Sequence, residues 1–61
     1  MNTYTIYELG YSGNESKHGF KAASDMEALL AAVSWAQGHG FKGWELVREG
    51  AHSPVALVSL S

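Results

Sequence analysis

Residues 24–37 read SDMEALLAAVSWAQ, and this stretch decides how the rest of the chain can fold. Ser24 and Glu27 fit a capping box, in which the Ser hydroxyl accepts a hydrogen bond from the Glu amide while the Glu carboxylate reaches back. The residues that follow are mostly Ala, Leu, Met and Glu, which are good helix formers, and Gly38 supplies a stop. The sequence therefore predicts one helix over residues 25–37.

The segments on either side of this helix favour strands. Residues 3–9 (TYTIYEL) are rich in β-branched and aromatic types, and residues 18–23 (HGFKAA) add a short second strand. Residues 43–48 (GWELVR) and 54–60 (PVALVSL) flank a glycine-containing loop, which is typical of an antiparallel hairpin. The glycine- and serine-rich segment 10–17 (GYSGNESK) predicts a connector that is too long for a tight hairpin.

The order of these elements, β-(β)-α-β-β, defines an α+β fold. We expect a single small domain over residues 1–61, with one helix packed on one face of a three- to four-stranded, mainly antiparallel sheet. Alternation along the strand at 43–48 places Trp44 and Leu46 on the face toward the helix. Trp44 is therefore expected to fill the core.

The run Gly43-Trp44-Glu45-Leu46-Val47 also carries a resemblance. After a tyrosine-rich first strand and a helix with an acidic first turn, this G-W-E-L-V signature is similar to that of a family of small bacterial and phage domains of unknown function. The resemblance implies a β-α-β-β core. It implies no catalytic or ligand-binding residue, so it leaves the function open.

Size and composition exclude several classes of function. The chain has 61 residues and no cysteine, which excludes disulfide scaffolds, thiol nucleophiles and thiolate zinc sites. So small a domain has little material for a deep active-site cleft, and we expect that it is not an enzyme. No apolar run is as long as a membrane span, and the first residues lack the pattern of a signal peptide. We expect a cytoplasmic protein with no membrane partner.

The candidate catalytic and metal-binding residues form no known motif. His18, His39 and His52 are spaced unlike any metal motif, although they could converge at one end of the sheet, and His39 is explained by the negative end of the helix. The serines lack the G-x-S-x-G pattern, and the segment 10–17 lacks the phosphate-loop pattern. We therefore predict no catalytic residue, no metal and no cofactor. A small-ligand or metal site built from glycine loops and histidines is a third alternative.

The helix carries the strongest functional signal. Its periodicity places four large apolar residues on one arc, which we expect to face the core: Met26, Leu29, Leu30 and Val33. The opposite face carries no Lys or Arg and presents an indole on a platform of alanines: Ala28, Ala31, Ala32 and Trp35. An apolar outer face suggests burial against another molecule, because small residues allow close approach and Trp is a common interface anchor. The alternative is that Trp35 folds over the helix end onto Phe41 or a loop and completes the core.

These observations predict a non-enzymatic protein-interaction module that acts by stoichiometric binding. Its partner would be another protein or a second copy of the chain, bound by Ala28, Ala31, Ala32 and Trp35. Small acidic domains of this kind are common among phage-borne or mobile-element-borne inhibitors of host machinery, which makes an inhibitor one form of this function.

The alternative function is a small nucleic-acid-binding protein that uses the open face of the sheet. Lys17, Lys21, Lys42 and Arg48 could be interleaved with Tyr11, Phe20 and an exposed tyrosine, on which bases stack. The chain has six Asp and Glu and four Lys and Arg, which gives a formal net charge of −2. This negative charge disfavours strong binding to phosphates. Nucleic acid is therefore the second choice of partner.

Overall fold

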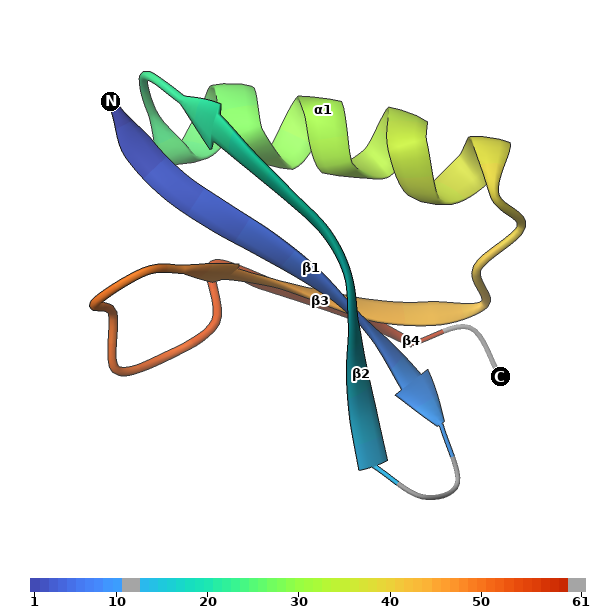
Figure 1. Ribbon diagram of the computed structural model, residues 1–61. Coiled ribbons are helices and arrows are strands. Elements are labelled where there is room, and N and C mark those ends of the chain that lie inside the picture. The colour runs from blue at the N-terminus through green and yellow to red at the C-terminus, as the bar shows by residue number, and fades with distance from the viewer. Residues whose placement is uncertain (11–12, 60–61) are drawn as a thin grey trace.

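The protein is described by a computed structural model that covers residues 1–10 and 13–59. Its elements follow in the order β1 (Asn2–Gly10), β2 (Gly13–Ala22), α1 (Asp25–Gly38), β3 (Gly43–Arg48) and β4 (Ala56–Ser59). The four strands form one antiparallel sheet in the order β2-β1-β3-β4, and α1 lies across one face of it (Figure 1). The predicted α+β class, with one helix on one sheet face, is confirmed.

The helix begins at the predicted cap. The Ser24 hydroxyl accepts a hydrogen bond from the Glu27 amide at 3.2 Å. The Glu27 carboxylate reaches back to the amide of Ala23, also at 3.2 Å, one residue before the position that a capping box uses. At the other end His39 is the C-cap residue, and Gly40 turns the chain away with a φ of 72°, which favours glycine.

The strand β2 is longer than the sequence predicts. It pairs with β1 from Asn2↔Ala22 to Gly10↔Gly13, so the prediction of a connector over residues 13–17 was wrong. Residues 13–17 are exposed, and a stretch of edge strand whose side chains all face water needs no apolar alternation. A register shift between Ile6 and Tyr7 adds an irregularity to the pairing. Tyr11 and Ser12, the rest of the predicted connector, lie outside the described residues.

The hairpin of β3 and β4 was predicted correctly, with a shorter last strand. β4 covers Ala56–Ser59 within the predicted range of 54–60, whose last residue lies outside the described part of the chain. The core lies between α1 and the sheet, and it consists of Tyr4, Ile6, Ala22, Ala28, Ala32, Ala36, Trp44 and Leu46. Trp44 is 4% exposed, which confirms its predicted place in the core.

The rotation of α1 about its own axis differs from the prediction. Ala28 and Ala32, which were expected on the outer face, are fully buried, whereas Met26 and Leu30 from the expected core arc are 68% and 65% exposed. One physical reason is the volume of the side chains. The sheet already fills the space between the layers with large side chains, so the helix approaches it with its smallest residues.

Replacing Trp44 with alanine tests the core. The variant Trp44→Ala should lower the free energy of unfolding by about 3–5 kcal/mol, because it leaves a cavity the size of an indole in a small core. Chemical denaturation monitored by circular dichroism measures the loss. Leu57→Ala is the control, since Leu57 is 63% exposed and should melt near the wild type. A Trp44→Ala protein with wild-type stability would contradict this placement.

A pair of alanine variants tests the rotation of the helix. Ala32→Glu should unfold the domain or cost more than about 3 kcal/mol, because it buries a carboxylate without a partner. Ala31→Glu makes the same change at the neighbouring exposed position and should stay within roughly 0.5 kcal/mol of the wild type. Thermal melts compare the two. The reverse order of stability would support the rotation that was first predicted.

Candidate protein-interaction surface

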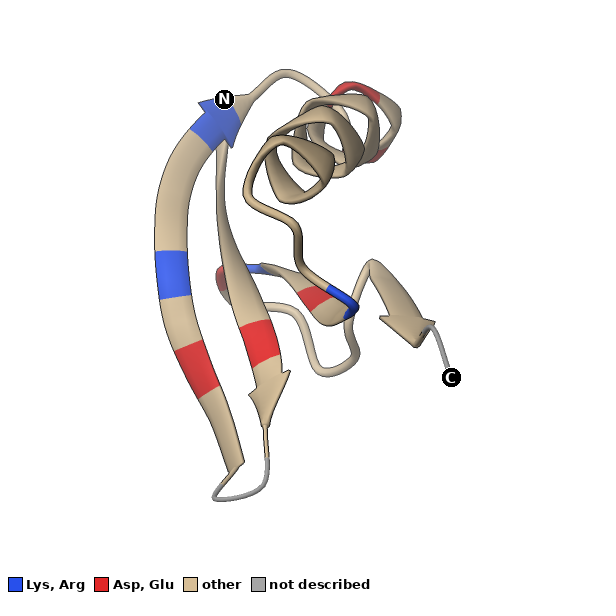
Figure 2. Cartoon of the chain, turned by 90° about the vertical axis from the view of Figure 1, so that its right-hand side faces the viewer, with Lys and Arg blue, Asp and Glu red and all other residues tan. Residues whose placement is uncertain are grey.

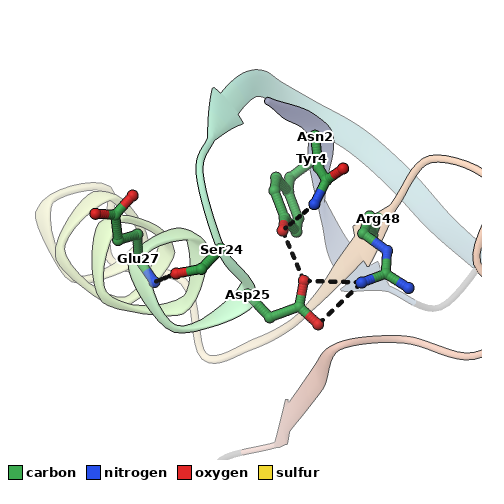
Figure 3. Close-up of polar contacts among 6 residues, drawn as sticks. All are labelled: Asn2, Tyr4, Ser24, Asp25, Glu27 and Arg48. Atoms are coloured by element: carbon green, nitrogen blue, oxygen red, sulfur yellow. Dashed lines mark hydrogen bonds and ion pairs between the residues drawn. The ribbon is translucent and has the colours of Figure 1, made fainter.

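A polar cluster at the start of α1 holds the helix to the sheet (Figure 3). The Tyr4 hydroxyl donates a hydrogen bond to Asp25 Oδ1 at 2.6 Å, and Asn2 Nδ2 donates to the Tyr4 hydroxyl at 3.4 Å. Arg48 Nη1 donates to both oxygens of Asp25, at 3.1 and 3.2 Å. The first residue of the helix is thereby joined to β1 and β3 at once.

The same contacts shift the pKa values of two members of this cluster. The hydrogen bond from Tyr4 lowers the pKa of Asp25 below its usual value, and the nearby Arg48 charge lowers it further. The hydrogen bond to Asp25 raises the pKa of Tyr4, and burial adds to the increase. A carboxylate that stays ionised and a phenol that stays protonated form a stable donor–acceptor pair, so this cluster is explained by its role in holding the helix.

These shifts predict how stability depends on pH. The folded-state pKa of Asp25 lies below the unfolded value of about 3.9, so its contribution is present above that pH and is lost as the pH falls through the folded value. The folded-state pKa of Tyr4 lies above about 10, so its contribution is present below that pH and is lost in stronger alkali. Both contributions are complete between about pH 5 and pH 9.

We expect Asp25→Asn to melt at a lower temperature than the wild type at neutral pH, with a smaller further loss on acidification. The reason is that the amide keeps the acceptor for Tyr4 but removes the charge that Arg48 binds. Melting temperatures measured from pH 2 to pH 8 give the comparison. Glu49→Gln, which removes an exposed carboxylate elsewhere, serves as the control. Coinciding curves for Asp25→Asn and the wild type would show that this carboxylate does not stabilise the fold.

The C-terminal end of α1 is held by aromatic stacking rather than by charge. Trp35 lies between His18 of β2, with ring centroids 4.8 Å apart, and His39, at 4.0 Å. Phe41 meets the indole edge-on at 5.2 Å, and His39 Nδ1 lies 2.9 Å from the carbonyl oxygen of Trp35. Trp35 is half-buried and packs against the core, as the alternative interpretation proposed.

The four residues predicted to bind a partner are therefore not brought together. Ala28 and Ala32 are fully buried between α1 and the sheet, Ala31 is exposed, and Trp35 is half-buried in the aromatic stack. The prediction of one outer face made of these four was wrong, because it assigned the large residues to the core and the small ones to solvent. Trp35 itself points toward β2 and not away from the sheet.

A different apolar surface is left open on the same helix. We call the side chains of Met26, Leu29, Leu30 and Val33 the α1 flank. Leu29 and Val33 are half-buried against the core, whereas Met26 and Leu30 are mostly exposed. The spacing of these residues puts them on neighbouring turns of one side of the helix. These four residues were predicted to share one arc of the helix that faces the core. They do share one side of the helix, but Met26 and Leu30 on that side face solvent.

The α1 flank lies on the side of the helix that faces β4. Trp35 projects from the opposite side, toward β2 at the far edge of the sheet. On the flank side, Val55, Ala56 and Val58 are half-buried against the core. The flank and the helix-facing side of β4 therefore lie toward the same edge of the sheet, and both are apolar.

The charged side chains of the described residues gather elsewhere. Lys17 lies 3.5 Å from Glu8 and 3.4 Å from Glu15, and the bond to Glu15 is the main reason for its raised pKa. Figure 2 shows these charges along β2 and β1, whereas β4 and the near turns of α1 carry none. Between residues 50 and 59 the sequence contains no Lys, Arg, Asp or Glu. Hence β4 and residues 50–55 before it carry no charge, and the charged residues of α1 are confined to Asp25 and Glu27 in its first turn.

The remaining candidate residues do not assemble into a site. His18 and His39 lie on either face of Trp35, while His52 lies in the loop between β3 and β4. Among residues 1–10 and 13–59, no three His, Asp or Glu side chains are placed to hold a metal ion. Within that same part of the chain, no helix is long and apolar enough to cross a membrane.

Comparisons of the chain with protein-family models, with curated proteins and with solved structures found no match. The resemblance carried by Gly43-Trp44-Glu45-Leu46-Val47 therefore stays a prediction. The structure itself explains this run, since Trp44 and Leu46 are core residues and Gly43 lies close to the Leu9 side chain.

Proposed function

We propose that this protein acts by stoichiometric binding to another protein chain through the α1 flank. The observation that carries the proposal is the exposure of Met26 and Leu30, at 68% and 65%, one turn apart on a helix without Lys or Arg. Burying one such side chain contributes about 1.5–3 kcal/mol. A helix face that meets only water normally carries charged residues, so this face is suited to a partner.

The contacts at both ends of the helix support the proposal. Asp25 is bound to β1 and β3, and Trp35 is stacked against β2. The flank is thereby presented from a helix whose position is fixed before a partner arrives, and less conformational entropy is lost on binding. By covering a functional surface of a larger assembly, such a flank would also act as an inhibitor.

The nucleic-acid alternative has less support from the described residues. Phe20 stacks on Tyr4 on the helix side of the sheet, so it is not on the open face. Lys17 and Arg48 are each paired with carboxylates. Tyr11, the other aromatic residue invoked for stacking, lies outside the described residues. A basic, aromatic face of the kind that binds single strands is not assembled from the residues that remain.

Site-specific photo-crosslinking tests the proposed function. The photoreactive residue p-benzoyl-phenylalanine replaces Leu30 in one variant and Ala31 in a matched control, and both are irradiated in the native cells. Both positions are exposed and adjacent in sequence, but only Leu30 belongs to the α1 flank. We expect a single covalent adduct of defined mass from position 30 and none from position 31.

Mass spectrometry of the adduct then identifies the bound chain and its stoichiometry. Adducts of equal yield from both positions, or no adduct from position 30, would contradict binding through the α1 flank. A nucleic-acid adduct from either position would favour the alternative function.

A further inference from the structure

We infer that the partner of the α1 flank is a second copy of this chain, with the two α1 helices packed side by side in antiparallel orientation. The inference rests on the proposed function, because it names the partner of that same surface. It follows from three features of the described residues: the incomplete cover of the sheet, the pattern of side chains along the flank, and the distribution of charge along the helix.

The first feature is that α1 covers only part of its sheet. Its main contacts are with β2 and β3, which lie on either side of β1, and β4 stands beyond them (Figure 2). A helix is about 10 Å across and strands are about 4.8 Å apart, so one helix covers roughly two strands. Ala56 and Val58 pair with the buried Leu46 and Trp44, which puts them on the helix-facing side, yet they are only half-buried. The position beside α1 on the β4 side is suited to a second helix.

The second feature is that the flank is complementary to itself. Met26, Leu30, Val33 and Gln37 follow one another along one line of the helix, at the spacing that packs helix against helix. In an antiparallel pair with a two-fold axis between Leu30 and Val33, Leu30 of each copy meets Val33 of the other. Met26 of each copy then meets Gln37 of the other. The same surface on both copies closes the pair, which is the commonest form of protein dimer.

The third feature is the distribution of charge along the helix. Asp25 and Glu27 lie in the first turn, no basic residue lies in the last turn, and His39 and Lys42 follow the helix end. Antiparallel packing brings the acidic first turn of one copy toward Lys42 of the other, and the two helix dipoles oppose one another favourably. A parallel pair would place the acidic turns together. Charge therefore favours a second copy in the antiparallel orientation.

The size of this surface sets the expected affinity. A standard interface covers about 800 Å² on each partner, which is roughly a fifth of the 4213 Å² surface of this chain. The flank consists of four side chains, two of which are already half-buried against the core, so the contact that it offers is small. We therefore expect a dimer with a dissociation constant in the micromolar range, visible as a mass that rises with concentration.

Sedimentation velocity of the purified chain, from about 5 µM to about 500 µM, tests the inference. The wild type should approach twice its 6.6 kDa mass. Leu30→Glu should weaken association roughly 30-fold or more, because it places a carboxylate against the apolar Val33 of the other copy, close to the two-fold axis. Ala31→Glu carries the same charge outside the flank and should dimerise like the wild type. A wild type that stays monomeric, or equal association by the two variants, would overturn the second copy as partner.

Introduced cysteines test the orientation, since the chain has none of its own. Under oxidation, the double variant Met26→Cys/Gln37→Cys should form a covalent dimer, whereas Met26→Cys alone should not. Efficient crosslinking of Met26→Cys alone would overturn the antiparallel arrangement. If the wild type is monomeric and photo-crosslinking at position 30 captures a different protein, the inference of a second copy as partner is wrong but the proposed function stands. Without any adduct at that position, the proposed function fails as well.

Discussion

The carboxylate of Asp25 determines how α1 is rotated, and most features of the surface depend on that rotation. It accepts a hydrogen bond from Tyr4 in β1 and is paired with Arg48 in β3. Because Asp25 shares one side of the helix with Ala28, Ala32 and Ala36, these contacts turn the alanines toward the sheet. The larger apolar residues are thereby turned to the β4 side.

The volumes of the two layers favour the same rotation. The sheet contributes Tyr4, Ile6, Trp44 and Leu46 to the core, and their side chains occupy most of the space under the helix. Alanines on the helix let the two layers approach closely, since interiors pack to a uniform density. Leucine or methionine in the same positions would separate the layers. The exposure of Met26 and Leu30 is thus a consequence of a core in which the helix contributes its alanines.

Much of the fold could be predicted from the sequence, because it depends on local signals. Ser24 and Glu27 marked the helix start, alternation in residues 43–48 placed Trp44 in the core, and the element order defined the fold class. The rotation of α1 depends on side chains about twenty residues away, and hydrophobicity alone ranks leucine above alanine for burial. The strand at residues 13–17 was missed because its pairing uses backbone groups and leaves its side chains exposed.

The two ends of α1 are held by different chemistry, and this matters for binding. Charged and polar hydrogen bonds fix the first turn, while Trp35, stacked between His18 and His39, fixes the last. Neither set of contacts involves Met26 or Leu30, so a partner that covers these side chains displaces nothing that stabilises the monomer. The core therefore uses the alanine side of the helix, and the binding that we propose uses the flank. This separation leaves the contacts of the core unchanged when the apolar surface of the flank is covered.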